Sequence, residues 1–89
     1  MKAVITVVGR DSIGIIAGIS AECAAYSVNI SEITQSVLSE YFVMIMIVDI
    51  SELKGDFSAF VDAMERHGES RNLEIHVMHE NIFTSMHEI

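Results

Sequence analysis

Residues 41–50, YFVMIMIVDI, constrain the fold of this chain more than any other segment. Successive side chains of a strand point to opposite sides of a sheet, and here both sides are apolar. One side carries Tyr41, Val43, Ile45 and Ile47, and the other carries Phe42, Met44, Met46 and Val48. This pattern predicts an interior strand that is covered above and below. The segment is far shorter than the roughly 20 apolar residues of a membrane-spanning helix.

Three other segments have the character of strands. Residues 2–8 are rich in β-branched side chains. Residues 30–38 alternate polar and apolar positions, with Ile33 and Val37 on the half-buried side, and residues 73–78 alternate in the same way. The first strand and the segment described above are the most apolar, so we expect them in the centre of the sheet and the other two at its edges.

Three segments have the spacing of helices. In the first, apolar residues recur at 3-4-3 spacing up to about Ser27, and Asp11 or Ser12 is expected to cap its first turn. In the second, Asp56 is expected at the cap, and the helix is predicted to end near Gly68. The apolar positions are Ile16, Ile19, Cys23 and Tyr26 in the first helix, Phe57, Phe60, Val61 and Met64 in the second, and Ile82, Phe83, Met86 and Ile89 in the tail.

This order of elements predicts an α+β, ferredoxin-like βαββαβ fold. Its four-stranded antiparallel sheet has the order 4-1-3-2, and both helices cover one face because both crossovers are right-handed. We expect a single domain over residues 1–89, with a core of residues 1–80 and a short helical tail of residues 81–89. One apolar side of the third strand then faces no helix. A monomer seldom exposes such a patch, so we expect the tail and a second subunit to cover it.

Charge and cysteine content narrow the classes of partner. The net charge is −8, with 13 acidic residues against 5 basic ones, which disfavours contact with nucleic acid or an anionic membrane. The single cysteine, Cys23, excludes an internal disulfide and fits a cytoplasmic location. Because it falls in an Ala-rich apolar helix, we expect a buried, inert thiol. The first residues read as a strand rather than a signal peptide.

The segment VVGRDSIGIIAGISAECAAYSVNI resembles the opening of ACT domains. It has a strand, a Gly, a polar pair, a Gly that opens a helix, and then Asn29 and Ile30 at the start of the second strand. Where the family often has Pro before the second Gly, this chain has Ile13. The similarity extends over essentially the whole chain. It points to the small stand-alone ACT proteins of bacteria and archaea and to the ACT units of glycine-cleavage repressors.

The resemblance implies a regulatory module that binds an amino acid or a related small effector where two domains meet. Carried over by position, the contacts are Arg10, Asp11, Ser12, Gly14, Ile15 and Asn29, with Ile30 as a wall. A helix N-terminus suits a carboxylate, and Gly14 leaves room for close approach. Asp11 offers an acceptor for an ammonium group, and Asn29 both donates and accepts. Alternatively, Gly14 only packs the helix on the sheet, Asp11 only caps it, and Asn29 only ends it.

Other chemistry has little support in the sequence. His76 and His79 lie three apart in a strand and so point to opposite faces, and we expect no metal site and no cofactor. His67 is expected to be exposed near the end of the second helix. Acylphosphatases share the predicted fold, but their loop signature is missing, and no Ser-His-Asp or Cys-His set is evident. We therefore expect no catalytic residue.

Two hypotheses remain open from the sequence. In the first, the chain is a ligand-responsive regulator that works as a homodimer or higher homo-oligomer. In the second, it is a structural pairing or protein-interaction module without a ligand of its own. The loop from Gly9 to Ile15, together with Asn29, favours the first, and the brevity of the chain favours the second.

Overall fold

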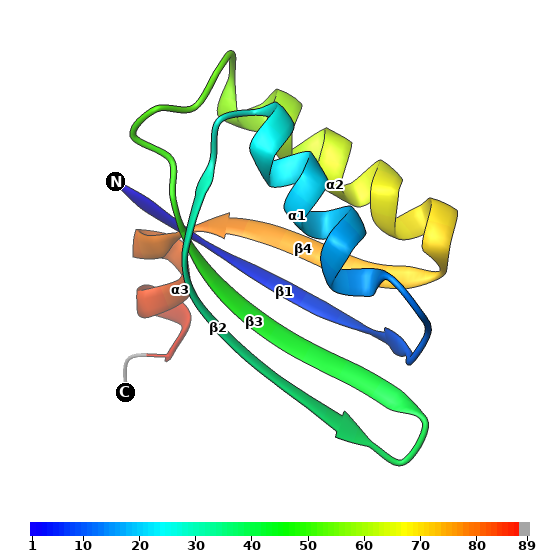
Figure 1. Ribbon diagram of the computed structural model, residues 1–89. Helices are drawn as coiled ribbons and strands as arrows, with labels where there is room; N and C mark the ends of the chain where they lie inside the picture. The colour runs from blue at the N-terminus through cyan, green and yellow to red at the C-terminus, as the bar shows by residue number, and fades with distance from the viewer. Residues whose placement is uncertain (88–89) are drawn as a thin grey trace.

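The computed structural model describes residues 1–87, with three helices and a four-stranded antiparallel sheet (Figure 1). The strands are β1 (Lys2–Arg10), β2 (Asn29–Leu38), β3 (Tyr41–Asp49) and β4 (Leu73–His79). The helices are α1 (Ile15–Ala25), α2 (Phe57–Arg71) and α3 (Glu80–His87). The order in the sheet is β2-β3-β1-β4. The predicted ferredoxin-like fold and its strand order are therefore confirmed.

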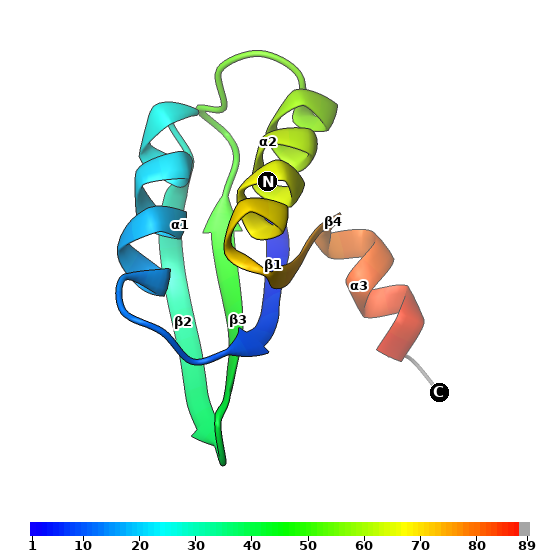
Figure 2. The same cartoon turned by 90° about the vertical axis from the view of Figure 1, so that its right-hand side faces the viewer.

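Helices α1 and α2 lie side by side on one face of the sheet (Figures 1 and 2). The side of β3 that faces them is buried, whereas on the other side Tyr41 and Ile45 are exposed. The buried set is Phe42, Met44, Met46 and Val48. With Ile5, Ile19, Phe60 and Met64, this set forms the centre of the core. The predicted division of β3 into a covered and an uncovered side is confirmed.

The buried stripe of α1 differs by one position from the predicted one. Ile15, Ile19 and Cys23 are buried, whereas Ile16 is exposed and Tyr26 is half-buried. The helix begins at Ile15, so the i, i+4, i+8 positions that follow from this start face the sheet. Ile19 and Cys23 were correctly predicted as core residues, and Ile16 was not.

Helix α2 extends beyond the predicted end at Gly68 as far as Arg71. Asn72 terminates it in the left-handed conformation, at φ 56°. Gly68 has a packing role instead, because a Cβ atom there would lie 2.6 Å from the carbonyl oxygen of Leu73. Asp56 holds the N-cap position as predicted, but its side chain accepts no capping hydrogen bond.

Strand β2 is more exposed than its alternating pattern predicts. Ile33 and Val37, predicted to be half-buried, are 42% and 52% exposed. β2 is an edge strand, and the β2–β3 hairpin projects beyond the helix layer (Figure 2). The helices therefore leave this end of β2 uncovered.

Helix α3 lies on the other side of the sheet from α1 and α2 and packs against β1 and β4 (Figures 1 and 2). Val4 faces that side of β1, yet it is only 3% exposed. The tail is therefore helical as predicted, and it covers part of the open face. Ile82 was predicted to pack on this face but is exposed, whereas Phe83 is half-buried. Ile89 and the side chain of Met86 lie outside the described residues.

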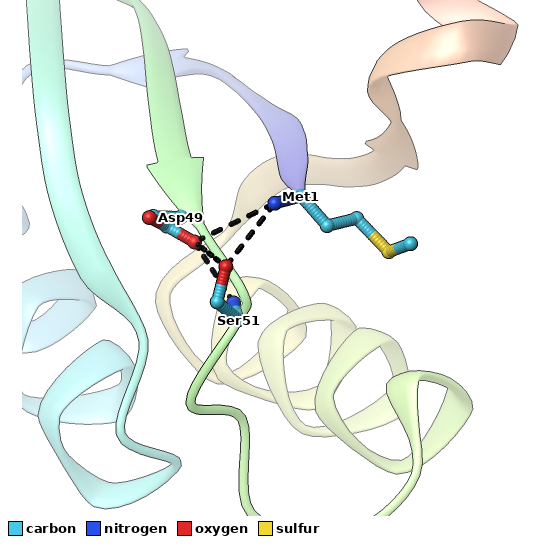
Figure 3. Close-up of polar contacts among 3 residues, drawn as sticks. All are labelled: Met1, Asp49 and Ser51. Atoms are coloured by element: carbon cyan, nitrogen blue, oxygen red, sulfur yellow. Dashed lines mark hydrogen bonds and ion pairs between the residues drawn. The ribbon is translucent and has the colours of Figure 1, made fainter.

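The N-terminal ammonium group interacts with residues at and just after the end of β3 (Figure 3). The terminal ammonium of Met1 donates to Ser51 Oγ at 3.1 Å and lies 3.9 Å from Asp49 Oδ1. Ser51 in turn donates to Asp49 Oδ1 from its hydroxyl, at 2.6 Å, and from its backbone N–H, at 2.8 Å. These two hydrogen bonds hold the pKa of the Asp49 carboxyl below its ordinary value.

No helix in residues 1–87 has both the length and the apolar character needed to cross a membrane.

Candidate functional site

The candidate site begins where β1 approaches the turn between α2 and β4. Strand β1 was predicted to stop before Gly9, but it continues to Arg10, and Gly9 pairs with Phe42 and Leu73. A Cβ atom on Gly9 would lie 2.6 Å from Leu73 Cδ2 and 3.1 Å from the carbonyl oxygen of Asn72. Glycine at this position therefore permits close contact between the end of β1 and the start of β4.

Arg10 and Asp11 are anchored to the β2–β3 turn. The backbone N–H of Asp11 donates to the carbonyl oxygen of Glu40 at 2.8 Å. The Arg10 guanidinium lies 3.8 Å from Glu40 Oε1 and 6.0 Å from the centre of the Tyr41 ring. Both Arg10 and Asp11 are exposed, so the Asp11 carboxylate faces solvent while its backbone is fixed.

Gly14 starts α1 in the left-handed conformation, at φ 84° and ψ 12°. It occupies the N-cap position and has no side-chain cap, so the prediction that Asp11 or Ser12 caps this helix is wrong. A Cβ atom on Gly14 would meet nothing within 4 Å. The alternative that Gly14 serves only to pack the helix is therefore also wrong, and the backbone conformation explains the glycine.

Arg71 reaches this loop from the last turn of α2. Its Nη2 donates to Ser12 Oγ at 3.2 Å and to the carbonyl oxygen of Ile13 at 2.9 Å. The sequence analysis missed Arg71, because the two partners are 58 and 59 residues apart and no local pattern links them. The sequence offered one signal, which was the presence of a basic residue in the last turn of the second helix.

Asn29 and Ile30 lie at the opposite end of the sheet. Arg10, Tyr41 and Leu38 pair in one terminal row, whereas Asn29 pairs with Asp49 in the other. At about 3.3 Å per residue, these rows are roughly 25 Å apart along β3. One copy of the chain therefore brings together residues 10–15 but keeps Asn29 and Ile30 away from them.

Two residues of the predicted set pack in or against the hydrophobic core. Ile15 is 2% exposed and belongs to the main hydrophobic cluster. Ile30 is half-buried and packs against the same cluster. Residues 10–14 are all exposed, so the surface of the loop is formed by three polar side chains, the apolar side chain of Ile13 and the open backbone of Gly14.

The histidines and the cysteine play different structural parts. His76 lies 3.4 Å from Glu74 on the open face, whereas the His79 ring packs edge-on against Phe57 of α2, so the two point to opposite faces as predicted. His67 was predicted to be exposed, but its Nε2 is buried and has no hydrogen-bond partner among the residues that the structure describes. Burial raises the pKa of Cys23 to about 11, with a smaller contribution from Glu22.

Neither a metal cluster nor a pocket is present in the part of the chain that the structure describes. No group of three or more His, Cys, Asp or Glu side chains among these residues is arranged to hold an ion. The loop that carries Arg10 to Gly14 likewise lies on an open surface, without a pocket among the described residues.

Comparison with known proteins assigns the chain to a family. Residues 2–78 match the family model described as ACT domain. A UPF0237 protein of Lactococcus lactis is 46% identical over 89 residues, which cover the whole of both chains. The structure of an ACT domain protein from Streptococcus pneumoniae superposes with a TM-score of 0.81 at 43% identity, covering 93% of each chain.

The fold is also found in larger proteins. The regulatory subunit of aspartate kinase from Thermus thermophilus superposes with a TM-score of 0.66 at 21% identity, covering 85% of this chain and 49% of that one. At this level of identity the likeness concerns the fold alone. The match over residues 2–78 and the full-length relative carry the assignment, and this chain belongs to the ACT domain family.

Proposed function

We propose that the chain is a regulatory, non-catalytic module that binds an amino acid or a related small effector between two copies of itself in the cytoplasm. Its family favours this function, because ACT domains are commonly modules of this kind. The buried free thiol of Cys23 is consistent with a reducing compartment. The single observation that carries the proposal is the separation of residues 10–14 from Asn29 within one copy.

The loop supports the chemistry of such a ligand. The N-terminus of α1 has no side-chain cap, so no capping side chain competes with a ligand carboxylate for its first amides. A ligand can approach Gly14 closely, because the space where a Cβ would stand is open. The exposed Asp11 carboxylate supplies a counter-charge for an α-ammonium group.

A second copy would complete the site through β2. Within the described part of one copy, no strand pairs with the outer side of this edge strand, which is ten residues long. Antiparallel pairing of two β2 strands about their middle would place Asn29 of one copy opposite Leu38 of the other. Leu38 lies in the same row as Arg10. Asn29 would thus arrive at the end of the sheet that carries the loop.

Two measurements test the proposal together. Light scattering at micromolar concentration should show a dimer or a larger assembly. Thr34→Lys should weaken it, because a two-fold axis near the middle of β2 brings the two new ammonium groups together. A thermal-shift screen against the twenty amino acids should identify a ligand, and Asp11→Ala should weaken its binding about tenfold or more. A monomer that no amino acid stabilises would refute the proposal.

The open face of the sheet favours a second candidate, a pairing module without a ligand. Helix α3 covers the side of β1 and β4, but large apolar side chains remain exposed elsewhere on this face. They are Val8, Leu38, Tyr41 and Ile45. Thr34 pairs with Ile45 and so shares this face, whereas Gln35 pairs with Met44 on the helix side. If Ile45→Lys abolishes self-association while Gln35→Lys does not, the copies pair through this face, and Asn29 does not reach the loop.

A further inference from the structure

Arg71 connects the two helices at the candidate site. Helix α1 begins at the end of the helix layer where α2 finishes (Figure 1). From the last turn of α2, Arg71 Nη2 donates to the Ser12 hydroxyl at 3.2 Å and to the Ile13 carbonyl oxygen at 2.9 Å. One guanidinium nitrogen therefore holds two consecutive residues of the loop that leads into α1.

The packing between the helices makes this reach possible. A Cβ atom on Gly18 would lie 2.8 Å from both Cε1 and Nε2 of His67 and 3.7 Å from Arg71 Nη1. His67 and Arg71 are four residues apart on α2 and so share one face of it. Because Gly18 has no side chain, that face of α2 approaches α1 closely, and the Arg71 side chain extends along α1 to its start.

The loop has few other fixed points. The Asp11 N–H anchors its first residue to Glu40, but the side chain of Ile13 is 98% exposed. Gly14 adds a left-handed backbone without a Cβ, which gives the loop wide conformational freedom in the absence of a restraint. Arg71 supplies the restraint between Asp11 and the first turn of α1.

We propose that Arg71 is a positioning residue for the ligand site. By holding Ser12 and Ile13, it keeps the Asp11 carboxylate and the first amides of α1 in one fixed arrangement. The role toward a ligand rests on the function proposed above, whereas the restraint on the loop does not. In the ligand-free protein, Arg71 lowers the frequency with which the loop and the first turn of α1 open.

Amide hydrogen exchange in the ligand-free protein tests the restraint. The Gly18 N–H bonds to the Gly14 carbonyl oxygen and so reports opening of the first turn, whereas the Met44 N–H in β3 reports the stability of the core. Arg71→Met should accelerate exchange at Gly18 about tenfold or more and leave Met44 within about twofold. Arg71→Lys keeps one donor and should restore much of the protection. Arg66→Met, which removes an exposed arginine of the same helix, should change neither amide.

A titration with a mixture of the twenty amino acids, followed by amide chemical shifts, tests the role in binding. Arg71→Met should weaken the wild-type response at least about fivefold, and Arg71→Lys should recover part of it. Unchanged exchange at Gly18 in Arg71→Met, or equal acceleration at Met44, would overturn the inference. If the wild-type protein responds to no amino acid, the proposed function fails together with the binding role of Arg71, while faster exchange at Gly18 would still establish the restraint.

Discussion

Gly18 of α1 and His67 of α2 are in such close contact that a single added methyl group would collide with the imidazole ring. The distance from an ideal Cβ on Gly18 to Cε1 and to Nε2 of His67 is 2.8 Å. Real Cβ contacts are longer than this, so the ring would have to move, and His67 Nε2 is already buried without a hydrogen-bond partner in residues 1–87. Glycine at position 18 therefore allows the imidazole of His67 to lie directly against α1.

Gly18→Ala should therefore destabilise the fold by about 1–3 kcal/mol through overpacking, although alanine is the better helix former. In a His67→Ala background the same substitution should be neutral or stabilising by about 0.5–1 kcal/mol, because the collision is gone and the helix propensity remains. Chemical denaturation of the four proteins of this cycle measures the coupling. An equal cost in both backgrounds would show that the ring is not the obstacle.

Cys23 should resist thiol reagents in the folded protein. With a pKa of about 11, its thiolate fraction at pH 8 is on the order of 100-fold below that of a thiol with the ordinary value of 9.0. Burial slows access of the reagent further, because the side chain is 1% exposed. Labelling with a chromogenic disulfide should be slow in buffer and fast in denaturant. Rapid labelling of the native protein would mean that α1 opens readily.

Asp49 should make the stability depend on pH in the acid range. Its folded-state pKa is lowered by the two hydrogen bonds from Ser51, so its contribution is fully present above the ordinary value of 3.8 and is lost as pH falls through the lower folded value. Asp49→Asn should lower the melting temperature at pH 7, and the difference from wild type should shrink on titration to about pH 2. Exposed Glu69→Gln on α2 serves as the control. A constant difference across this range would contradict a role for the ionised carboxylate.

Removal of α3 should cost stability because it uncovers Val4. Truncation after Glu80 exposes this side chain and part of β4, and at about 25 cal/mol per Å² we expect a loss of about 1–2 kcal/mol. Ile82→Ser, at a position that is 57% exposed, should change the unfolding free energy by less than about 0.5 kcal/mol. Thermal and urea unfolding report both. If the truncated protein unfolds as wild type does, another part of the chain protects Val4.

Periodicity predicted the fold well because the pattern depends on which face of each element is buried. The βαββαβ succession of elements predicted the order of the sheet, and the apolar character of β1 and β3 agreed with their central positions. Element ends were less predictable, since glycine serves different purposes. Gly9 and Gly68 permit close packing against Leu73 and end nothing, whereas Gly14 supplies a left-handed backbone.

The candidate site could be predicted only as a set of residues. The loop from Arg10 to Gly14 was predicted as part of a site because the chain resembles ACT domains, in which the loop after the first strand contacts the ligand. Its link to Arg71 depends on tertiary packing between residues nearly 60 positions apart, for which a single sequence has no local signal. Arg10 pairs with one end of β3 and Asn29 with the other, so the distance between them is set by the pairing of the strands in the folded sheet.

The separation of Arg10 and Asn29 would also make ligand binding depend on the concentration of the protein. If both residues serve one ligand, each two-fold pair has two equivalent sites, and no site exists in an isolated copy. Occupancy and assembly are then thermodynamically linked, so that the ligand promotes pairing and pairing raises the apparent affinity. Diluting the protein below the dissociation constant of the pair should therefore weaken binding even with ligand in excess, and the response would depend on how much of the protein is present as well as on how much ligand.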